Sequence, residues 1–410
     1  MMSLLRLAWS NLWRNRRRTW ITLAALAFSI MLVQTSHNLS TGVYSQMIES
    51  GVRAGSGHLT VYRGNYLETR DEKLGFNPQE FSEKLKSIEA VETVLPRIYL
   101  AGLAQSSRES RGIVLSGIDP LLEQSINPIL KRLPASSGLP DMASRQALVG
   151  DRLLKELQLK EGSKFVVTLQ NRQGEMVSEL LRVHGVVHSG IRHLDRSLVM
   201  IGLHRAATLA GMPDEVHELA LILKNGLGNE TPAAEIAALL PGDRGLRLYF
   251  WDEAMTNLAN AIKLDYASQQ FMFLIILMIV TIGVVNTLLM AVMERTREFG
   301  TILALGARAS VLHRMLFLEA LILGALGLLL GTFFGSLATW YLVEKGIDLQ
   351  NWIEGELEFG GVVFEPVMRA VWEPLWMLKI GIYVLSLCIL ASLYPAYRAG
   401  RIVPAESMRK

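Results

Sequence analysis

Four long apolar segments divide this sequence, and polar stretches separate each of them from the next. A helix that crosses a bilayer needs about 20 predominantly apolar residues. The first segment follows a basic region, as the apolar part of a signal peptide would, but no small-residue cleavage site follows it. We therefore interpret it as a retained signal anchor. The pattern predicts transmembrane helices at residues 19–38, 269–293, 313–343 and 373–396.

The long segment 39–268 alternates between the periods of strands and helices, and both of its ends are helical in pattern. The predicted fold class is an α-helical membrane protein with four transmembrane helices plus a large α/β extracytoplasmic (periplasmic) domain inserted between helices 1 and 2. The ends of this domain are expected to be helical stalks, the second of them running unbroken from Asp252 into the membrane. Residues 121–145 have an irregular pattern and are a candidate subdomain junction. Strands are expected at 58–62, 91–104, 112–118, 165–170, 180–187, 197–201, 219–224 and 246–250.

The placement of Lys and Arg predicts the orientation in the membrane. Basic residues gather in 1–18, between the second and third apolar segments, and in 397–410, whereas the loop 344–372 is acidic. Because basic flanks stay in the cytoplasm, both termini are expected there, with the large domain in the periplasm. Residues 1–18 also space their apolar side chains as a helix does, which predicts a cytoplasmic interfacial helix; the alternative is a basic flank without a helix of its own.

Composition excludes several classes of protein. The chain has 410 residues, is 50% hydrophobic and 19% charged, and carries a formal net charge of +3, which is too small to indicate nucleic-acid binding. Its one cysteine, Cys388, excludes a disulfide framework within the chain.

The charged turn after the second apolar segment is the main candidate site. Residues 294–312 form an amphipathic segment held between two predicted spans, which is more typical of a docking surface than of a linker. The charged side chains suit charge-assisted contacts with a partner, and the apolar ones suit a buried contact. The alternative is a helix that only lies on lipid. The candidate docking residues are Glu294, Arg295, Thr296, Arg297, Glu298, Phe299, Gly300, Ile302 and Leu303.

The third apolar segment contains two further features. Gly327, Gly331 and Gly335 recur every four residues, so they share one helix face and predict close packing against another helix. Glu319 lies near the cytoplasmic start of this segment, where we expect it to pair with Arg314 rather than to relay protons.

Motifs for catalysis and metal binding are absent from the sequence. There is no G-x-x-x-x-G-K-[ST] phosphate loop, no H-E-x-x-H and no G-x-S-x-G, so an enzyme acting alone is not expected. His184, His188 and His193 do not have zinc-site spacing, and only Asp195 is a nearby acid, so we assign no metal. Any energy from nucleotide must come from another chain.

Two motifs resemble a known family. Residues 286–307 (NTLLMAVMERTREFGTILALGA) and 394–409 (YPAYRAGRIVPAESMR) are similar to the FtsX/MacB-type permeases of ABC transporters. The resemblance covers nearly the whole chain, and the layout is most like the LolC/LolE lipoprotein-releasing permeases. The opening residues depart from that branch and would also suit a MacB-like efflux permease.

The resemblance implies mechanotransmission. Two permease subunits would pair, as a homodimer or as a heterodimer with a paralogue, and ABC ATPase subunits would dock on the coupling helix at 294–312. ATP and Mg would be bound by the ATPase, with no cofactor in this chain. The resemblance also implies a location in the bacterial inner membrane, surrounded by lipid.

Within this family the substrate stays open at the level of sequence. Extraction of lipoproteins for transport to the outer membrane is the favoured interpretation. MacB-like efflux of peptides or drugs, and a transmembrane signalling or scaffold permease, are the alternatives. As a hypothesis, apolar residues of the stalks contact the acyl chains: Val43, Met47, Met255, Leu258 and Ile262.

Overall fold

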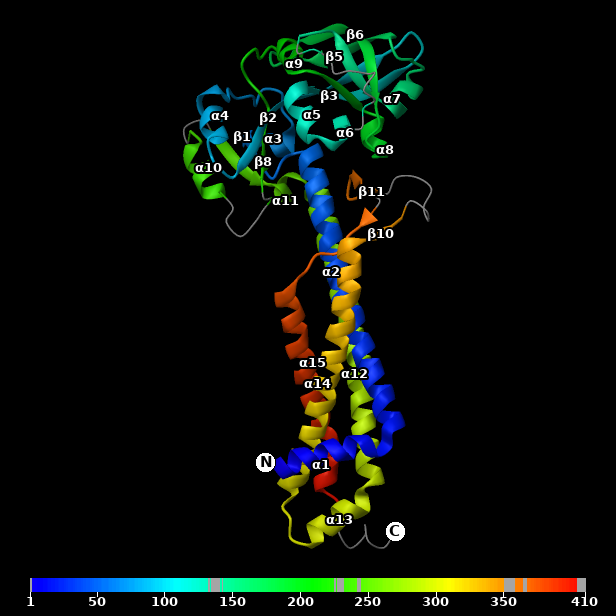
Figure 1. Cartoon of the computed structure of the whole chain (residues 1–410). Helices are drawn as coiled ribbons and strands as arrows, with labels where there is room; N and C mark the ends of the chain where they lie inside the picture. The colour runs from blue at the N-terminus through cyan, green and yellow to red at the C-terminus, as the bar shows by residue number, and fades with distance from the viewer. Residues whose placement is uncertain are drawn as a thin grey trace. The chain divides into compact units, whose positions relative to one another are not determined.

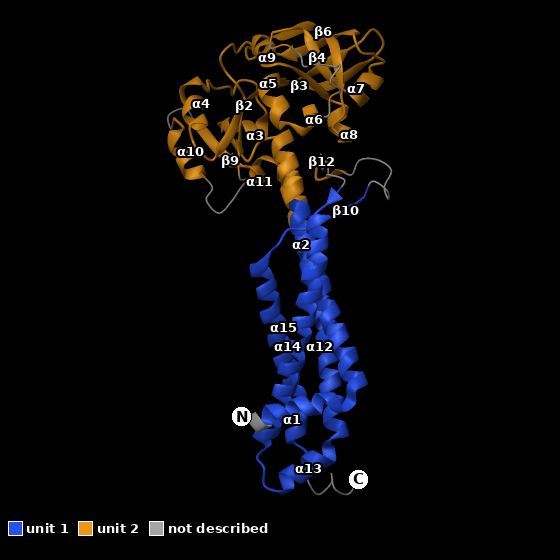
Figure 2. Cartoon of the chain, viewed as in Figure 1, with its two compact units in different colours: residues 1–44, 264–352, 367–410 blue, residues 45–263, 353–366 orange. Residues whose placement is uncertain are grey.

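A computed structural model gives the structure of the chain (Figure 1). Parts of the predicted loop 344–372, the predicted tail 397–410 and the irregular stretch 121–145 lie outside the described residues. The chain divides into two compact units, which Figure 2 colours separately: residues 1–44, 264–352 and 367–410 form the first, and residues 45–263 and 353–366 form the second. The structure describes residues 2–131, 133, 141, 143–224, 226, 232–241, 245–349, 358–363 and 367–403.

Four long helices dominate the first unit. They are α2 (Arg16–Ala54), α12 (Thr256–Glu294), α14 (Ala309–Glu344) and α15 (Pro374–Gly400). Each is long and apolar enough to cross a membrane, as the sequence predicted. Helices α2 and α12 also contribute residues to the second unit. The shorter elements of the first unit are α1 (Met2–Leu12), the 3₁₀ turn η1 (Trp13–Asn15), α13 (Thr296–Ala304), and the paired strands β10 (Ile347–Asp348) and β13 (Val367–Met368).

Helices α2 and α14 pack closely along the predicted row of glycines. A Cβ on Gly327 would lie 2.3 Å from the side chain of Leu26, and one on Gly331 would lie 2.6 Å from the Cβ of Ile30. Gly335 faces the next turn of α2 in the same way. The glycines therefore contact a helix of the same chain. Buried residues of α2, α12, α14 and α15 form one apolar cluster beside this row, including Leu23, Leu26, Leu288, Leu323, Val384 and Cys388.

The second unit is an α/β domain built on a nine-stranded sheet. Its strands follow the order β3-β7-β4-β6-β5-β2-β8-β1-β9. The eight strands expected from the sequence are present, with ends shifted by up to a few residues, and β4 is a ninth strand of the same sheet. The bounds of the nine strands are β1 (Leu59–Arg63), β2 (Val91–Gln105), β3 (Ser110–Ile118), β4 (Gln146–Gly150), β5 (Lys164–Gln170), β6 (Met176–Val187), β7 (Leu198–Gly202), β8 (Glu218–Leu223) and β9 (Leu246–Phe250).

The sheet closes on itself over part of its width. Strand β3 pairs with β2 as well as with β7, so β2, β3, β7, β4, β6 and β5 form a closed six-stranded ring. Residues 98–105 of β2 pair with β3, whereas residues 91–97 of the same strand pair with β8. One long strand therefore joins the ring to the remaining strands β8, β1 and β9.

Short helices and a hairpin complete the second unit. Two of the helices occupy the start of the stretch that the sequence pattern marked as irregular. Asp119 caps the first of these through its side chain, which accepts hydrogen bonds from the amides of Leu121 and Leu122, and Pro120 follows at N1. The elements are α3 (Tyr66–Thr69), α4 (Gln79–Lys86), α5 (Pro120–Ile126), α6 (Pro128–Lys131), α7 (Asp151–Glu156), α8 (Arg192–Asp195), α9 (Leu203–Ala210), α10 (Ala233–Leu239), α11 (Trp251–Ala254), and the hairpin of β11 (Glu358–Phe359) and β12 (Val362–Val363).

The stalk expected to run unbroken from Asp252 into the membrane is interrupted. Helix α11 ends at Ala254 and α12 begins at Thr256. Met255 between them has φ −113° and ψ 59°, outside the helical region, although its amide still donates to the carbonyl of Trp251. The prediction of one continuous helix was therefore wrong at this residue.

A buried charge cluster connects several elements of the second unit. Arg97 of β2 is 2% exposed and forms ion pairs with Glu123 of α5 and Glu218 of β8. It also donates to the carbonyl of Gly55, just after α2. Glu218 accepts a further hydrogen bond from the hydroxyl of Tyr62 at 2.5 Å. Because buried charges require partners, this cluster fixes the end of α2 against the sheet within the unit.

Candidate functional site

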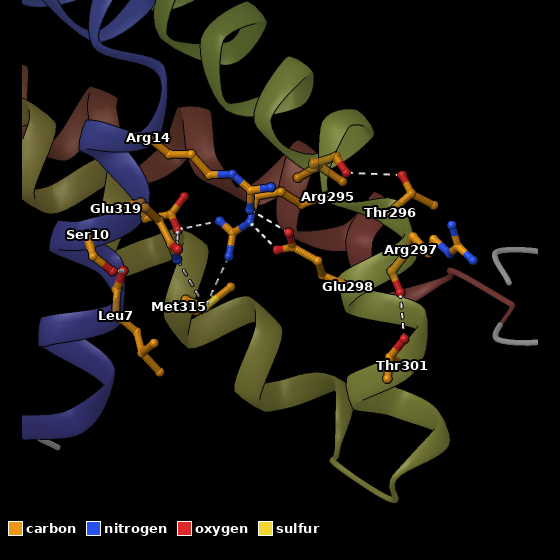
Figure 3. A network of polar contacts seen from close by, with 12 residues as sticks. Leu7, Ser10, Arg14, Arg295, Thr296, Arg297, Glu298, Thr301, Met315 and Glu319 are labelled. Atoms are coloured by element: carbon orange, nitrogen blue, oxygen red, sulfur yellow. Dashed lines mark hydrogen bonds and ion pairs between the residues drawn. The ribbon is translucent and has the colours of Figure 1, made fainter. Parts of the chain in front are cut away.

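The candidate site is the turn between α12 and α14, where helix α13 lies (Figure 3). Arg295, with φ −109° and ψ 13°, breaks the helical path between α12 and α13. At the other end, Gly306 has φ +90°, a left-handed value that suits glycine. The amide of Gly306 donates to Leu303 O, and the amide of Ala307 donates to Ile302 O. This pair of bonds is a Schellman motif, which ends the helix and turns the chain toward α14.

A buried polar network ties this turn to its neighbours (Figure 3). Arg295 Nη1 donates to Glu319 Oε1 of α14 at 2.9 Å, and the Asn11 amide of α1 donates to the same oxygen at 2.8 Å. Glu319 is 2% exposed, and Arg295 is 8% exposed. Arg295 Nε also donates to Glu298 Oε2 at 3.3 Å. Three segments that are distant in the sequence are therefore joined through one carboxylate.

Apolar packing holds α13 from its inner side. Phe299 is completely buried in a cluster with Val292 of α12, Leu312 and Leu316 of α14, and Ala396 of α15. The guanidinium of Arg295 lies 4.8 Å from the centre of the Phe299 ring. A cation at this distance is attracted to the ring face. Helix α13 therefore packs against α12, α14 and α15.

Ion pairs at the surface connect the turn to the N-terminal segment. Arg14 of η1 pairs with Glu298, and Arg18 Nη1 of α2 lies 2.9 Å from Glu294 Oε1. The hydrogen bond from Arg14, with a smaller contribution from Arg295, holds the pKa of Glu298 below its ordinary value against the opposing effect of burial. Glu298 is therefore ionised at neutral pH. Exposed pairs of this kind contribute little energy but orient the side chains.

The outer face of α13 carries the side chains that are free to meet a partner. Arg297, Thr301 and Leu305 are exposed and follow one another at intervals of four residues, so they form a row along one side. The hydroxyl of Thr301 donates to the carbonyl of Arg297, as Figure 3 shows. Leu305 is 83% exposed, more than any other large apolar residue that the structure describes. Leu305 was not among the predicted docking residues, although it lies one residue before Gly306.

The structure divides the predicted docking residues into two groups. Glu294, Arg297 and Glu298 are exposed, and Thr296 is partly exposed. The prediction that Phe299 supplies the contact with a partner was wrong for this state, because Phe299 is buried within its own chain. The buried or partly buried group, which packs inward, is Arg295, Phe299, Gly300, Ile302 and Leu303.

The predicted pairing of Glu319 with Arg314 was also wrong. The partners of Glu319 are Arg295 and Asn11. The reason is geometric, since the break at Arg295 directs its side chain back toward α14 while the α1 segment covers the other side (Figure 3).

The residues proposed as acyl-chain contacts have different environments. Met47 and Leu258 are buried at 2% and 1% exposure, so neither offers a surface in this structure. Val43 and Ile262 are partly exposed. Met255 lines an apolar cavity of about 180 Å³ inside the second unit, together with Ala54, Ile129, Leu194 and Val362.

Comparisons with known proteins show which permeases this chain is similar to. Residues 270–404 match the model of the FtsX-like permease C-terminal family. Several relatives match most of the chain, and three of them show the range. LolE of Haemophilus influenzae, a lipoprotein-releasing system transmembrane protein, is 22% identical, and the alignment covers 80% of this chain and 80% of LolE. LolC of Neisseria meningitidis serogroup B, also a lipoprotein-releasing system transmembrane protein, is 24% identical, and the alignment covers 81% of this chain and 81% of LolC.

The third relative is longer than this chain. The macrolide export ATP-binding/permease protein MacB of Escherichia coli is 25% identical over 79% of this chain but over only 51% of its own length. These comparisons confirm the suspected resemblance: residues 270–404 form an FtsX-like permease domain, and the chain has LolC, LolE and MacB as homologues. With its four candidate spans, it is a multi-pass membrane protein.

Proposed function

We propose that this chain is the permease subunit of an ABC transporter that releases lipoproteins from the bacterial inner membrane by mechanotransmission. In this proposal the chain hydrolyses no ATP itself. A separate ABC ATPase docks on α13 in the cytoplasm, and its movement reaches the substrate through the long helices. A second permease subunit, identical or paralogous, completes the membrane part.

The observation that carries the proposal is the way in which α13 is fixed. The Arg295–Glu319–Asn11 network and the burial of Phe299 join α13 to α1, α12, α14 and α15. Because packed interiors transmit displacement rather than absorb it, a force on the outer face of α13 would move the neighbouring helices. A helix that only rested on lipid would need no such attachment.

The outer face of α13 suits an ATPase groove. Leu305 supplies an apolar anchor, and Arg297 with Glu298 supplies charges of both signs beside it. Interfaces of this kind gain most of their energy from a few central anchors, and the charged rim adds specificity.

The same orientation would place the second unit in the periplasm. The basic residues near α1, α13 and the end of α15 favour the cytoplasm for that side of the membrane. The second unit would then be the part that meets the lipoprotein or its acceptor.

Lipoprotein release is favoured over efflux by the layout of the chain. The LolE and LolC relatives match it over about four fifths of both lengths, and their names describe lipoprotein release. Acyl chains need apolar surface, and we propose that the partly exposed Val43 and Ile262, together with Met255 at its cavity, contribute to that surface.

The test is release of a triacylated lipoprotein from proteoliposomes that contain this permease and its ATPase. The expected result is release that requires ATP and is lost when the lipoprotein lacks its acyl chains. A matched control uses an ATPase that binds ATP but does not hydrolyse it. Absence of release in a complex with normal ATP hydrolysis would contradict the proposal.

Efflux is the second candidate, because MacB matches the chain at a similar level of identity. In the same proteoliposomes, stimulation of ATP hydrolysis by a macrolide or a peptide, without lipoprotein release, would favour efflux. Hydrolysis that responds to neither substrate class would favour a signalling permease.

A further inference from the structure

Asp151, His188 and Asp195 converge at one edge of the six-stranded ring in the second unit. Strands β4 and β6 are parallel neighbours, and their last residues, Gly150 and Val187, are opposite each other. Because parallel strands end at the same edge of a sheet, the residues that follow them, Asp151 and His188, lie side by side. Asp195 arrives from the last position of α8.

The ligand atoms of these three side chains are close together. His188 Nδ1 lies 3.5 Å from Asp151 Oδ2 and 3.7 Å from Asp195 Oδ2. One atom from each side chain lies within 4.8 Å of the other two. Two carboxylates and an imidazole therefore point toward one small volume.

The carboxylate of Asp195 is buried, and only one of its two oxygens accepts hydrogen bonds from the described residues. It is 1% exposed, and its Oδ1 accepts hydrogen bonds from the amide and the hydroxyl of Ser189 at 2.8 and 2.6 Å. Its Oδ2, which faces His188, has no hydrogen-bond donor among the described residues, and the buried Oδ1 of Asp151 has none there either. Burying carboxylate oxygens without partners is costly, so these two oxygens favour a cation as their partner.

The backbone also permits the close approach of α8. A Cβ on Gly150 would lie 2.3 Å from the carbonyl oxygen of Asp195 and 3.0 Å from its Cα. Any larger residue at position 150 would therefore push Asp195 away from Asp151 and His188. Glycine at the end of β4 is a requirement of this arrangement.

We propose that Asp151, His188 and Asp195 bind a divalent transition-metal ion, with Zn²⁺ as the preferred ion. Zinc bonds to His nitrogen and Asp oxygen are about 2.0–2.2 Å long, so tetrahedral ligand atoms lie about 3.4 Å apart. The distances of 3.5 and 3.7 Å from His188 are close to this value. The imidazole favours zinc over calcium or magnesium, which take oxygen ligands. Water would fill the fourth position.

One cation already lies beside the cluster. Lys155 Nζ is 3.2 Å from Asp151 Oδ2, but the lysine side chain is 75% exposed. Exposed pairs of this kind are weak, so a metal ion would displace the ammonium group. The sequence alone assigned no metal because Asp151 is distant from the histidines in the chain, and only the parallel pairing of β4 and β6 brings it to His188.

The bound ion would fix a wall of the apolar cavity described above. Ser189, Ile191 and Leu194 line that cavity, and they lie between His188 and Asp195 in the chain. Linking β4, β6 and α8 through one ion would therefore hold the loop that closes this side of the cavity.

The test is titration of the full-length permease, in detergent and stripped of metal by a chelator, with Zn²⁺ followed by calorimetry. The cluster variants are Asp151→Asn, His188→Gln and Asp195→Asn; the last keeps an oxygen that can accept from Ser189. Matched controls are His184→Gln and His193→Gln, which alter nearby histidines outside the cluster. Thermal unfolding of each variant without metal shows whether it is folded.

We expect one Zn²⁺ to bind per chain. Each cluster variant should lower the affinity for Zn²⁺ by about tenfold or more, since losing even an outer-shell partner of a metal ligand has an effect of this size. The two control variants should bind Zn²⁺ as the wild type does. Lys155→Met should strengthen binding, because it removes the competing cation. Absence of stoichiometric binding by the wild-type chain would overturn the proposal. So would unchanged affinity in folded Asp151→Asn and His188→Gln variants, or a preference for Ca²⁺ over Zn²⁺.

Discussion

Arg295 Nη1 donates a hydrogen bond to Glu319 Oε1 at 2.9 Å, and this ion pair joins the turn after α12 to the first turns of α14. Both side chains are buried. A buried pair is strongly destabilised when one partner is removed, whereas replacing both partners by apolar residues is tolerated. The pair is therefore a specific attachment that can be tested separately from the surface charges around it.

Removing one partner of this pair should be worse than removing both. We expect Arg295→Met to destabilise the permease by about 3–5 kcal/mol, because Glu319 would remain buried without its partner. The double variant Arg295→Met/Glu319→Leu should recover much of this loss. Thermal unfolding in detergent measures both effects. If the single and double variants lose the same stability, the cost of removing Arg295 does not come from leaving Glu319 unpaired.

Leu305 should be the apolar anchor for the ATPase. Leu305→Asp places a charge on the outer face of α13 and should weaken capture of the ATPase by about 2 kcal/mol or more, as is typical of a central anchor. Leu121→Asp is the matched control, since Leu121 is 77% exposed but belongs to α5 of the second unit. Pull-down of the ATPase by each variant tests this. Equal loss at both positions would point to a general defect instead.

The glycine row should set the distance between α2 and α14. Gly331→Ala introduces a methyl group 2.6 Å from Ile30 Cβ and 2.9 Å from the carbonyl of Ala27, so the helices must separate. We expect a loss of about 1–3 kcal/mol, the usual cost of overpacking. Gly283→Ala in α12 is the control, because a Cβ there meets no atom within 4 Å. If Gly331→Ala and Gly283→Ala lower the unfolding temperature equally, the glycine row does not set the distance between the helices.

The buried cluster around Arg97 should stabilise the second unit. Arg97→Met leaves Glu123 and Glu218 buried without their cation, and the expected cost is about 3–5 kcal/mol. Arg111→Met removes solvent-accessible pairs with Glu109 and Glu156 and should change stability little. Limited proteolysis of the full chain distinguishes the two variants. An Arg97→Met variant that resists proteolysis as well as the wild type would show that the second unit does not need the Arg97 ion pairs.

The second unit should lose stability below neutral pH through His217. Burial lowers the pKa of His217, although the hydrogen bond with the Glu72 carbonyl opposes this effect. Its Nδ1 accepts from the Tyr99 amide, and its Nε2 lies 3.0 Å from Glu72 O, so the neutral ring fits both partners. The unfolded chain then binds more protons than the folded one, and stability falls as the pH drops through about 6.5.

Hydrogen exchange at the Tyr99 amide measures this effect locally. Exchange should accelerate between about pH 7 and 5 beyond the intrinsic change of the amide rate. His217→Gln should remove this extra acceleration, whereas His204→Gln, at an exposed position, should retain it. A wild-type profile that follows the intrinsic rate alone would rule out the histidine as the cause.

The elements of this fold follow from local patterns, whereas the site depends on contacts between distant residues. Apolar length identified the four long helices, and alternation identified the strands, because both signals are local. The partners of Glu319 were assigned wrongly because Asn11 is far away in the sequence and the break at Arg295 redirects that side chain. The burial of Phe299 likewise depends on α12, α14 and α15 meeting around it.

We predict that α13 couples ATP hydrolysis to lipoprotein release. The most direct test is the number of lipoproteins released per ATP hydrolysed in proteoliposomes, for the wild type and for Phe299→Ala. This variant leaves the outer face of α13 intact but removes the ring that packs against α12, α14 and α15. We predict that the ATPase still binds and hydrolyses ATP, while release per ATP falls about tenfold, the effect of about 1.4 kcal/mol of lost coupling. An unchanged ratio in a folded Phe299→Ala complex would show that the packing of α13 does not transmit the movement.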